Sequence, residues 1–359
     1  MEFTGRLWRF QMAKTILGVD VGGDTLKLAL VSGGTVKKLA SVPLPLNMLK
    51  DGHITSTEAM GELLRNALRS EGIRCRKGAC VLSDESVFLR TVTMPKMTEQ
   101  QLSYNIPFEF NDYIVGEPGD YEFDYAMLEP QANKAPAAPD PFTEANEILE
   151  TDAAAEDGME LMLAAVRKDA LAEIRESLRR AGVHLVKAAP AVSACISLIR
   201  ASGRDKGTET CFVDLGYKAI RVYMFRGDRH VVTRTLELGM NVLDALIAER
   251  YNVDEHRAHA YLLSNFNDCQ SRHACETAYN RIAVELVRAL NFYRFSENDS
   301  ELSELWLLGG GTAIEPLRAI IAENIAPMAV RDAATLVPGT EGFAHPSIFM
   351  QAIGIAMQD

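Results

Sequence analysis

The hydrophobic pattern near the start of the chain predicts a three-stranded β-meander. Residues 16–21 form a short apolar run that contains Asp20 and is followed by the break at Gly22-Gly23. Residues 26–30 then alternate leucine with other side chains, which is typical of a strand with one buried face. After a second glycine turn, residues 35–44 predict a third strand that ends at prolines.

The same pattern returns in the second half of the chain and keeps its register. Asp214 follows an apolar run as Asp20 does, and Gly216 stands where the first copy has Gly22. A second turn then leads to a strand over 230–238. Two halves of this kind predict a duplicated α/β domain whose copies face a shared cleft. Ligands of such folds bind in the cleft.

Between the halves, residues 83–128 predict a small inserted module with a strand, a helix over about 98–110 and further strands that end at 121–127. Residues 129–158 are almost wholly Ala, Pro, Glu, Asp, Asn and Thr. Such a composition buries too little apolar surface to offset the entropy of ordering. We therefore expect this segment to be a disordered acidic linker.

Amphipathic patterns over 170–181 and 278–296 predict helices that flank the sheets. The chain is then expected to contain two similar domains, the inserted module and the linker. The expected bounds are 12–82 with 159–200 and a returning 345–359 for the first domain, 83–128 for the module, 129–158 for the linker and 201–344 for the second domain.

Charge and composition narrow the classes of function. A net charge of −12 disfavours nucleic acid and anionic lipid surfaces as partners. The sequence has no apolar run of the roughly 18 residues that a membrane span requires and no apolar segment typical of a secretory signal; Met12 is a second candidate start besides Met1. Six cysteines without a CxxC pair are interpreted as reduced thiols: Cys75, Cys80, Cys195, Cys211, Cys269 and Cys275. We expect a cytoplasmic protein without direct membrane insertion.

The turns that follow the first strand of each half have the composition of phosphate-binding loops. Glycine lets backbone N–H groups point inward, and the threonine and lysine of the first copy add a hydroxyl and a positive charge. Asp20 and Asp214 would face each other and hold Mg²⁺ through water. The candidate residues of the two turns are Asp20, Gly22, Gly23, Asp24, Thr25, Lys27, Asp214, Gly216 and Lys218.

A third candidate element lies late in the second half. Residues 305–308 form an apolar run that opens through Gly309, Gly310 and Gly311 into a helix near residue 314. Flat ligands such as adenine pack well on bare backbone. Glycine after a strand is common, so each element alone is weak evidence, but the three in this order favour a nucleotide cleft. The chain lacks both the GxGxxG of a dinucleotide fold and the GK[ST] of a P-loop.

The two meanders and the triple glycine resemble the phosphate and adenosine motifs of the actin, Hsp70 and sugar-kinase superfamily. Within it, the chain resembles the PilM family of type IV pilus assembly proteins, which are actin-like and FtsA-like. The segments that carry this likeness are residues 94–99 (MPKMTE), 106–114 (IPFEFNDYI), 124–125, 166–169 (VRKD), 288–293 (RALNFY) and 352–356 (AIGIA). The resemblance implies an actin-like (ribonuclease H-like) duplicated two-domain α/β fold with an inserted small α+β subdomain.

The resemblance also implies a function. It implies that the chain is a cytoplasmic scaffold of a type IV pilus, or of a related secretion or competence machine. We expect the cleft to bind ATP or ADP with Mg²⁺. The inserted module would bind the cytoplasmic N-terminal tail of a PilN-like inner-membrane protein. The chain would thus be recruited to the inner face of the membrane beside other pilus assembly proteins, and self-association is left open.

Two departures from the family pattern bear on activity. Where the family commonly has an acidic residue before a proline that faces the nucleotide, residues 188–190 read AAP, so a candidate water-activating group is missing. After Gly216 the family tends to small or hydroxyl residues, whereas here Tyr217 and Lys218 follow, and the tyrosine ring could fill the pocket. We therefore treat binding and turnover separately and expect at most a weak ATPase.

Two other classes share parts of the pattern. A hexokinase-like or ROK-type sugar kinase has a similar first phosphate motif, and Asp112 is the nearest candidate for its catalytic base, although the small-residue helix start expected after it is missing. An FtsA-like cell-division filament protein usually carries a C-terminal amphipathic membrane helix, and residues 346–359 are too short and too apolar for one.

One further group of histidines and cysteines lies close together in the sequence and could suggest a metal site. These residues match no standard zinc spacing and are interpreted as solvent-facing helix positions: His256, His259, Cys269, His273 and Cys275.

Overall fold

The structure is a computed structural model of the chain, and it describes residues 15–45, 47–128, 158–205, 207–297 and 300–357. The expected disordered linker, apart from Gly158 at its end, and the two candidate starts Met1 and Met12 lie outside the described residues. In the described part, no helix is both long enough and apolar enough to span a membrane.

A five-stranded sheet forms the core of the first half. Its strand order is β10 (His184–Pro190), β6 (Lys77–Leu82), β1 (Thr15–Val21), β2 (Thr25–Ser32) and β3 (Thr35–Pro43). β1, β2 and β3 form the antiparallel meander predicted from the sequence, and β6 and β10 extend it as parallel strands. Asp20 on β1 pairs in register with Lys27 on β2.

A second five-stranded sheet repeats this arrangement. Its order is β13 (Arg229–Leu236), β12 (Ile220–Arg226), β11 (Glu209–Leu215), β14 (Glu304–Leu308) and β15 (Ala329–Asp332). Again three antiparallel strands are extended by two parallel ones. Asp214 pairs with Arg221 just as Asp20 pairs with Lys27. The structure therefore contains the duplication that the sequence pattern indicates.

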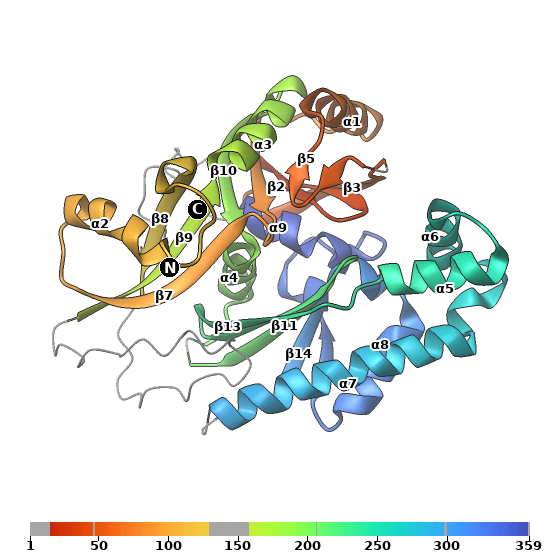
Figure 1. Cartoon of the computed structure of the whole chain (residues 1–359). Coiled ribbons are helices and arrows are strands. Elements are labelled where there is room, and N and C mark those ends of the chain that lie inside the picture. Colours follow the sequence, from red (N-terminus) through yellow and green to blue (C-terminus); the bar gives the residue numbers. More distant parts are fainter. Residues whose placement is uncertain (1–14, 46, 129–157, 206, 298–299, 358–359) are drawn as a thin grey trace.

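Two helices lie between the sheets. α4 (Ala191–Ser202) and α9 (Met350–Met357) pack against each other, and their buried side chains share one core with both sheets. α4 is buried over almost its whole length, as expected for a helix that is apolar nearly all round. These two helices therefore join the two halves through a shared core (Figure 1).

The other helices cover the outer faces of the sheets. α1 (Thr57–Ser70) and α3 (Lys168–Arg180) pack on the first sheet. The second sheet is covered by α5 (Asn241–Tyr251), α7 (His273–Ser296) and α8 (Glu315–Ile325), with α6 (Glu255–Leu263) against α5. A short hairpin, β4 (Leu49–Lys50) and β5 (His53–Ile54), lies before α1.

The inserted module has a sheet of its own, in the order β7 (Val87–Pro95), β9 (Gly158–Arg167) and β8 (Tyr121–Met127). α2 (Glu99–Asn105) packs on it and begins with a capping box between Thr98 and Gln101. The helix predicted over about 98–110 changes at Ile106 to a 3-10 segment that ends at Phe110. Pro107 lacks the N–H that a continuing α-helix needs.

β9 differs from the expected position of the domain boundary. The sequence analysis placed residues from 159 onward in the first domain, whereas β9 is the central strand of the module's sheet and pairs with both β7 and β8. Its apolar stretch is buried on both faces, as a central strand requires. The strand that completes the module thus follows the expected linker in sequence, and α3 begins immediately after it.

Candidate functional site

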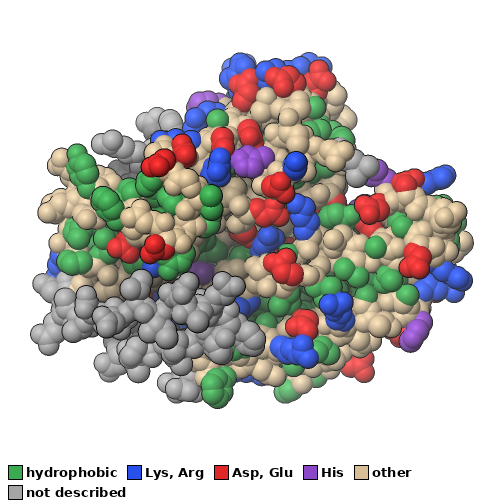
Figure 2. All heavy atoms as spheres, in the orientation of Figure 1, with side chains coloured by type: hydrophobic (Ala, Val, Ile, Leu, Met, Phe, Trp, Pro, Cys, Tyr) green, Lys and Arg blue, Asp and Glu red, His purple; other side chains and the backbone are tan. Residues whose placement is uncertain are grey.

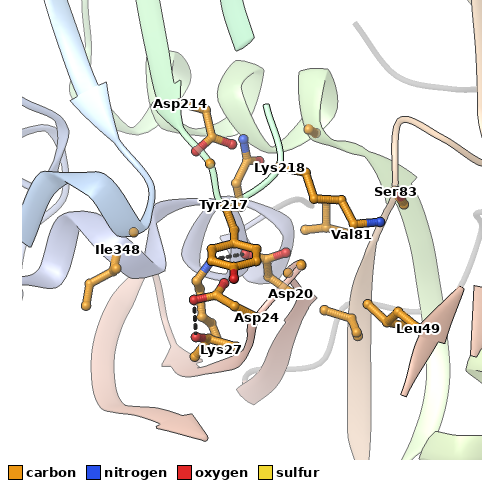
Figure 3. Close-up of a pocket in the computed structure, with 18 of the residues that line it drawn as sticks. Asp20, Asp24, Lys27, Leu49, Val81, Ser83, Asp214, Tyr217, Lys218 and Ile348 are labelled. Carbon is orange, nitrogen blue, oxygen red and sulfur yellow. Dashed lines mark hydrogen bonds and ion pairs between the residues drawn. The ribbon is translucent and has the colours of Figure 1, made fainter. Parts of the chain in front are cut away.

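A cavity of about 230 Å³ lies between the two halves. The turn between β1 and β2 and the turn after β6 line it from the first half. From the second half it is lined by the turn between β11 and β12, the end of α6 and Gly310. Figure 3 shows Asp20, Asp24 and Lys27 on one side of this cavity and Asp214 and Lys218 on the other.

Both turns close tightly around glycine. The N–H of Gly22 donates to the carbonyl of Thr25 at 3.0 Å, and a Cβ on Gly22 would lie 2.9 Å from that oxygen. A Cβ on Gly216 would lie 2.5 Å from the carbonyl oxygen of Ala219, the equivalent atom in the second copy. Since a Cβ does not approach an oxygen this closely, any other residue would open the turn and redirect its backbone N–H groups.

Lys27 places a positive charge beside the first turn. Its Nζ lies 3.3 Å from Oδ2 of Asp20. Burial lowers the pKa of Lys27, but the carboxylates of Asp20, Asp214 and Asp24 outweigh burial and raise this pKa above its usual value. The lysine therefore stays charged at neutral pH and offsets part of the negative charge around the cavity.

His259 connects the two halves beside the first turn. Its Nε2 lies 3.2 Å from Oδ2 of Asp24, and its Nδ1 lies 2.9 Å from Oδ2 of Asp244, a buried residue of α5. Burial alone would lower the pKa of His259, but the hydrogen bonds to the two carboxylates raise it to about 10. The interpretation of His259 as a solvent-facing helix residue is therefore wrong, because tertiary packing turns it into the cavity.

Tyr217 lies between the two turns. Its ring packs edge-to-face against His259, with ring centroids 5.7 Å apart, and a Cβ on Gly23 would lie 3.3 Å from its Cδ1. Burial and the neighbouring Asp244 raise the pKa of the phenol, so the tyrosine is neutral at physiological pH. Figure 3 shows the ring in the middle of the cavity beside Asp24. The tyrosine thus occupies part of the space between the turns, as its place in the sequence suggests.

Asp214 is the acidic group of the second turn. Burial raises its pKa to about 6, although the nearby Lys27 lowers it. Gly309 has a left-handed backbone with φ of 90°, and a Cβ at this position would collide with Oδ1 of Asp214. The glycine after β14 therefore makes room for the Asp214 carboxylate.

Three ion pairs connect the two halves beside the cavity. They are Asp84–Arg221 at 2.6 Å, Glu85–Lys218 at 3.4 Å and Asp24–His259 at 3.2 Å. In each pair the first half supplies the acid and the second half supplies the base. In Figure 2, acidic and basic side chains gather side by side at the centre of the face shown. Complementary charge thus stabilises the contact between the two halves beside the cavity.

Most residues singled out from the sequence come together at this cavity. Those that line it are Asp20, Gly22, Gly23, Asp24, Thr25, Lys27, Asp214, Gly216, Lys218 and Gly310. Gly309 and Gly311 lie behind Gly310, where a Cβ would collide with Asp214 or with Leu215.

The sequence analysis did not assign several other lining residues to the site, among them Asp84, Arg221, His259 and Gln351. Arg221 had a detectable signal, because it occupies the position in the second copy that Lys27 occupies in the first. The other three come from a loop or helix that only the fold brings to the cavity.

The remaining candidates lie elsewhere. Asp112 is exposed on the inserted module and is not among the residues that line the cavity, so the base considered for the sugar-kinase alternative does not lie there. Cys269 and Cys275 are buried, and Cys269 donates to the carbonyl of Tyr261, so the interpretation of these two cysteines as solvent-facing is wrong. The described residues contain no group of three or more His, Cys, Asp or Glu side chains placed to hold a metal ion.

The residues around the cavity fit a nucleotide carrying Mg²⁺. Mg²⁺ is usually held by one or two carboxylates together with substrate phosphates and water, and Asp20 and Asp214 both line the cavity. Lys27 and Lys218 supply positive charge for phosphates. A Cβ on Gly310 would meet nothing within 4 Å, so bare backbone is open to a flat ligand here.

Comparison with known protein families gives a match along nearly the whole chain. The model of the family described as type IV pilus assembly protein PilM matches residues 18–146 and 145–358. The chain belongs to the PilM family. The resemblance seen in the module and the turns is thereby confirmed.

Solved structures agree with this assignment. A chain of the PilM-PilN type IV pilus biogenesis complex superposes with a TM-score of 0.76 at 23% identity, covering 97% of this chain and 98% of that one. The ethanolamine utilization protein EutJ from Carboxydothermus hydrogenoformans superposes with a TM-score of 0.57 at 12% identity, covering 98% and 92%. The actin-like, duplicated α/β fold expected for a PilM protein is therefore confirmed. No curated protein matches the sequence.

Proposed function

We propose that this PilM protein is an actin-like, nucleotide-binding scaffold on the cytoplasmic side of a type IV pilus assembly machine. The observation that carries the proposal is that, in a PilM family member, two equivalent glycine turns with Asp20 and Asp214 line one cavity between two similar halves. ATP or ADP with Mg²⁺ would bind there. The domain bounds expected from the sequence are kept, with β9 assigned to the inserted module.

Each part of the cavity has a role in this proposal. Asp20 and Asp214 hold Mg²⁺ through water, the two turns and Lys27 bind phosphate oxygens, and Gly310 faces the adenine. Bound nucleotide contacts both halves and so stabilises their closed arrangement. Lys218 reaches a phosphate only if it leaves Glu85, which is an exposed pair and therefore weak.

The inserted module supports a role in partner binding. Among the described residues, several of the most exposed large hydrophobic side chains lie on this module: Tyr104 at 70%, Phe108 at 68%, Val115 at 79% and Met127 at 53% exposed. Figure 2 shows hydrophobic side chains on this part of the surface. Exposed apolar clusters commonly mark binding sites for apolar peptides. We assign this surface to the cytoplasmic N-terminal tail of a PilN-like protein, which would recruit the scaffold to the membrane.

Point variants of the module test this assignment, because deleting residues 83–128 would remove both partners of β9. Fluorescence anisotropy with a labelled peptide of a PilN cytoplasmic tail should give at least tenfold weaker binding for Phe108→Ser and for Tyr104→Ser. Phe295→Ser on α7 removes an aromatic side chain that is 84% exposed and is the matched control. Equal affinity for the peptide in all three variants would contradict the assignment of the PilN tail to the surface of the module.

Turnover is expected to be slow or absent. In-line attack on a terminal phosphate needs a group that orients or activates water, and losing such a group typically costs about 10²-fold or more. Ala189, just before Pro190, stands where the resemblance to the family implies an acidic residue. Calorimetry with Mg-ATP and a phosphate-release assay test the two parts separately. Undetectable binding at millimolar Mg-ATP would contradict the nucleotide site, and several turnovers per second would contradict the slow step.

A further inference from the structure

The cavity between the two halves is small for a nucleotide. Its volume of about 230 Å³ lies below the roughly 300–1,000 Å³ that small-molecule sites usually have. A side chain of the protein takes up part of the space, because the ring of Tyr217 lies in the middle of the cavity (Figure 3). The space between the two glycine turns is therefore smaller than their backbones alone would leave.

The ring of Tyr217 connects the two turns directly. Tyr217 belongs to the turn between β11 and β12, and Gly23 belongs to the turn between β1 and β2. A Cβ on Gly23 would lie 3.3 Å from Cδ1 of Tyr217, so even a single added carbon would be crowded there. A phosphate group is larger, and to bind both turns it has to lie between them. The ring in this position and a phosphate bound to both turns thus exclude each other.

Contacts within the second half hold the tyrosine in this position. Its carbonyl accepts a hydrogen bond from the N–H of Asn241 at 3.0 Å, and a Cβ on Gly239 would collide with the same oxygen. The ring edge packs against His259 with centroids 5.7 Å apart, and burial together with the nearby Asp244 raises the pKa of the phenol. The tyrosine therefore moves with the second half and touches the first half at its glycine turn.

We propose that Tyr217 stands in for the phosphates of the nucleotide in the unliganded protein: its ring fills the phosphate position, links the two turns and must leave before a nucleotide binds. This inference rests on the proposed nucleotide site. The ring is only half-buried and borders open space, so it can rotate to another staggered position while the core stays intact.

The stand-in lowers the measured affinity for nucleotide. When only a fraction of the molecules has the ring displaced, the apparent affinity is the intrinsic affinity multiplied by that fraction. A ring that is in place in about nine molecules of ten therefore weakens binding about tenfold. The same ring adds an apolar contact to the ion pairs that connect the two halves, so the unliganded protein loses stability when the ring is removed.

Calorimetry with the full-length protein tests the inference. Tyr217→Ser should bind Mg-ATP and Mg-ADP at least tenfold more tightly than the wild type, because the phosphate position is then free. Adenosine carries no phosphate, so its affinity for the variant should stay within about twofold of its affinity for the wild type. Tyr217→Phe keeps the ring and should bind Mg-ATP within about threefold of the wild type. A gain in affinity does not arise from damage to the fold.

Melting temperatures give a second readout. Without ligand, Tyr217→Ser should melt below the wild type, and saturating Mg-ATP should raise its melting temperature by more than it raises that of the wild type. Tyr251 provides a matched control, since its ring packs edge-to-face against Tyr261 with centroids 5.6 Å apart and does not line the cavity. Tyr251→Ser should also melt lower but should bind Mg-ATP as the wild type does.

The possible outcomes separate this inference from the proposed function. If the wild type binds Mg-ATP and Tyr217→Ser binds it equally or more weakly, the stand-in is overturned while the nucleotide site remains. An equal gain for adenosine would also overturn it, because the ring would then block the base and not the phosphates. If only Tyr217→Ser binds Mg-ATP, the inference holds and nucleotide binding by the native chain fails. If neither protein binds Mg-ATP, both are overturned.

Discussion

Asp24 and His259 show how one residue can decide whether a turn accepts phosphate. An ionised carboxylate in a phosphate-binding turn repels the ligand. Here the imidazolium of His259 lies 3.2 Å from Asp24 and cancels that charge, and Asp244 holds the imidazole from the other side. The histidine comes from the opposite half, so the electrostatic character of the first turn depends on the second half.

Removing His259 should therefore weaken nucleotide binding. His259→Ala leaves Asp24 without its cation beside the phosphates, and we expect Mg-ATP affinity to fall about tenfold, which is about 1.4 kcal/mol. Adding Asp24→Asn to the His259→Ala variant removes the unneutralised carboxylate and should restore most of the affinity for Mg-ATP. Isothermal titration calorimetry measures both effects. His256→Ala, at an exposed position on the same helix, should bind as the wild type does, and a loss equal to that of His259→Ala would contradict the argument.

The pH dependence of stability should report the same contact. The pKa of His259 is raised from 6.5 to about 10 in the folded protein. A group whose folded pKa is raised stabilises fully below its unfolded pKa and loses that contribution as the pH rises through the folded value. The difference in urea midpoint between wild type and His259→Ala should thus be largest near pH 6 and shrink towards pH 10. A difference that is constant with pH would show that the imidazolium does not contribute.

At the scale of elements, ion pairs connect the turns of the first half with the second half. β6 ends in a loop that carries Asp84 and Glu85, and β12 begins just before Arg221. Asp84–Arg221 is partly buried, with side chains 28% and 20% exposed, whereas Glu85–Lys218 is 37% and 47% exposed. Water screens the second pair far more than the first.

The two pairs should therefore differ in their contribution to stability. Arg221→Ala leaves the carboxylate of Asp84 partly buried without its cation, and we expect a loss of about 1–3 kcal/mol in the free energy of unfolding. Lys218→Ala should cost about 0–1 kcal/mol. Urea denaturation followed by circular dichroism compares them directly. Equal losses would mean that burial does not determine the strength of these pairs.

At the scale of the whole molecule, a ligand that contacts both halves should act as a link between them. Binding of Mg-ATP only to the folded, closed state stabilises it by about 2.7 kcal/mol at a concentration of 100 times Kd. The melting temperature should rise steadily with Mg-ATP and less so with ATP plus a chelator. Asp214→Asn lacks a carboxylate for the cation and should show a much smaller rise. An unchanged melting temperature in the wild type at saturating Mg-ATP would contradict the link.

The sequence by itself determined the repeated local features. The order of strand, glycine turn and strand can be detected in both halves, because alternating burial and the need for glycine in a tight turn depend on residues close together in sequence. Gly22 and Gly216 are found in this way, and so are Asp20 and Asp214. The sequence motifs of the inserted module and the sequence AAP at residues 188–190 can also be recognised without a structure.

Only the tertiary structure decided which distant residues share the cavity. His259 looked like an ordinary helix residue, Arg221 pairs with Asp84 instead of with the aspartate beside it in register, and Gln351 arrives on a helix from the far end of the chain. β9 joins the module although it follows the expected linker. The physical reason is that contacts between elements depend on how buried faces pack, and local sequence patterns specify those faces without specifying their partners.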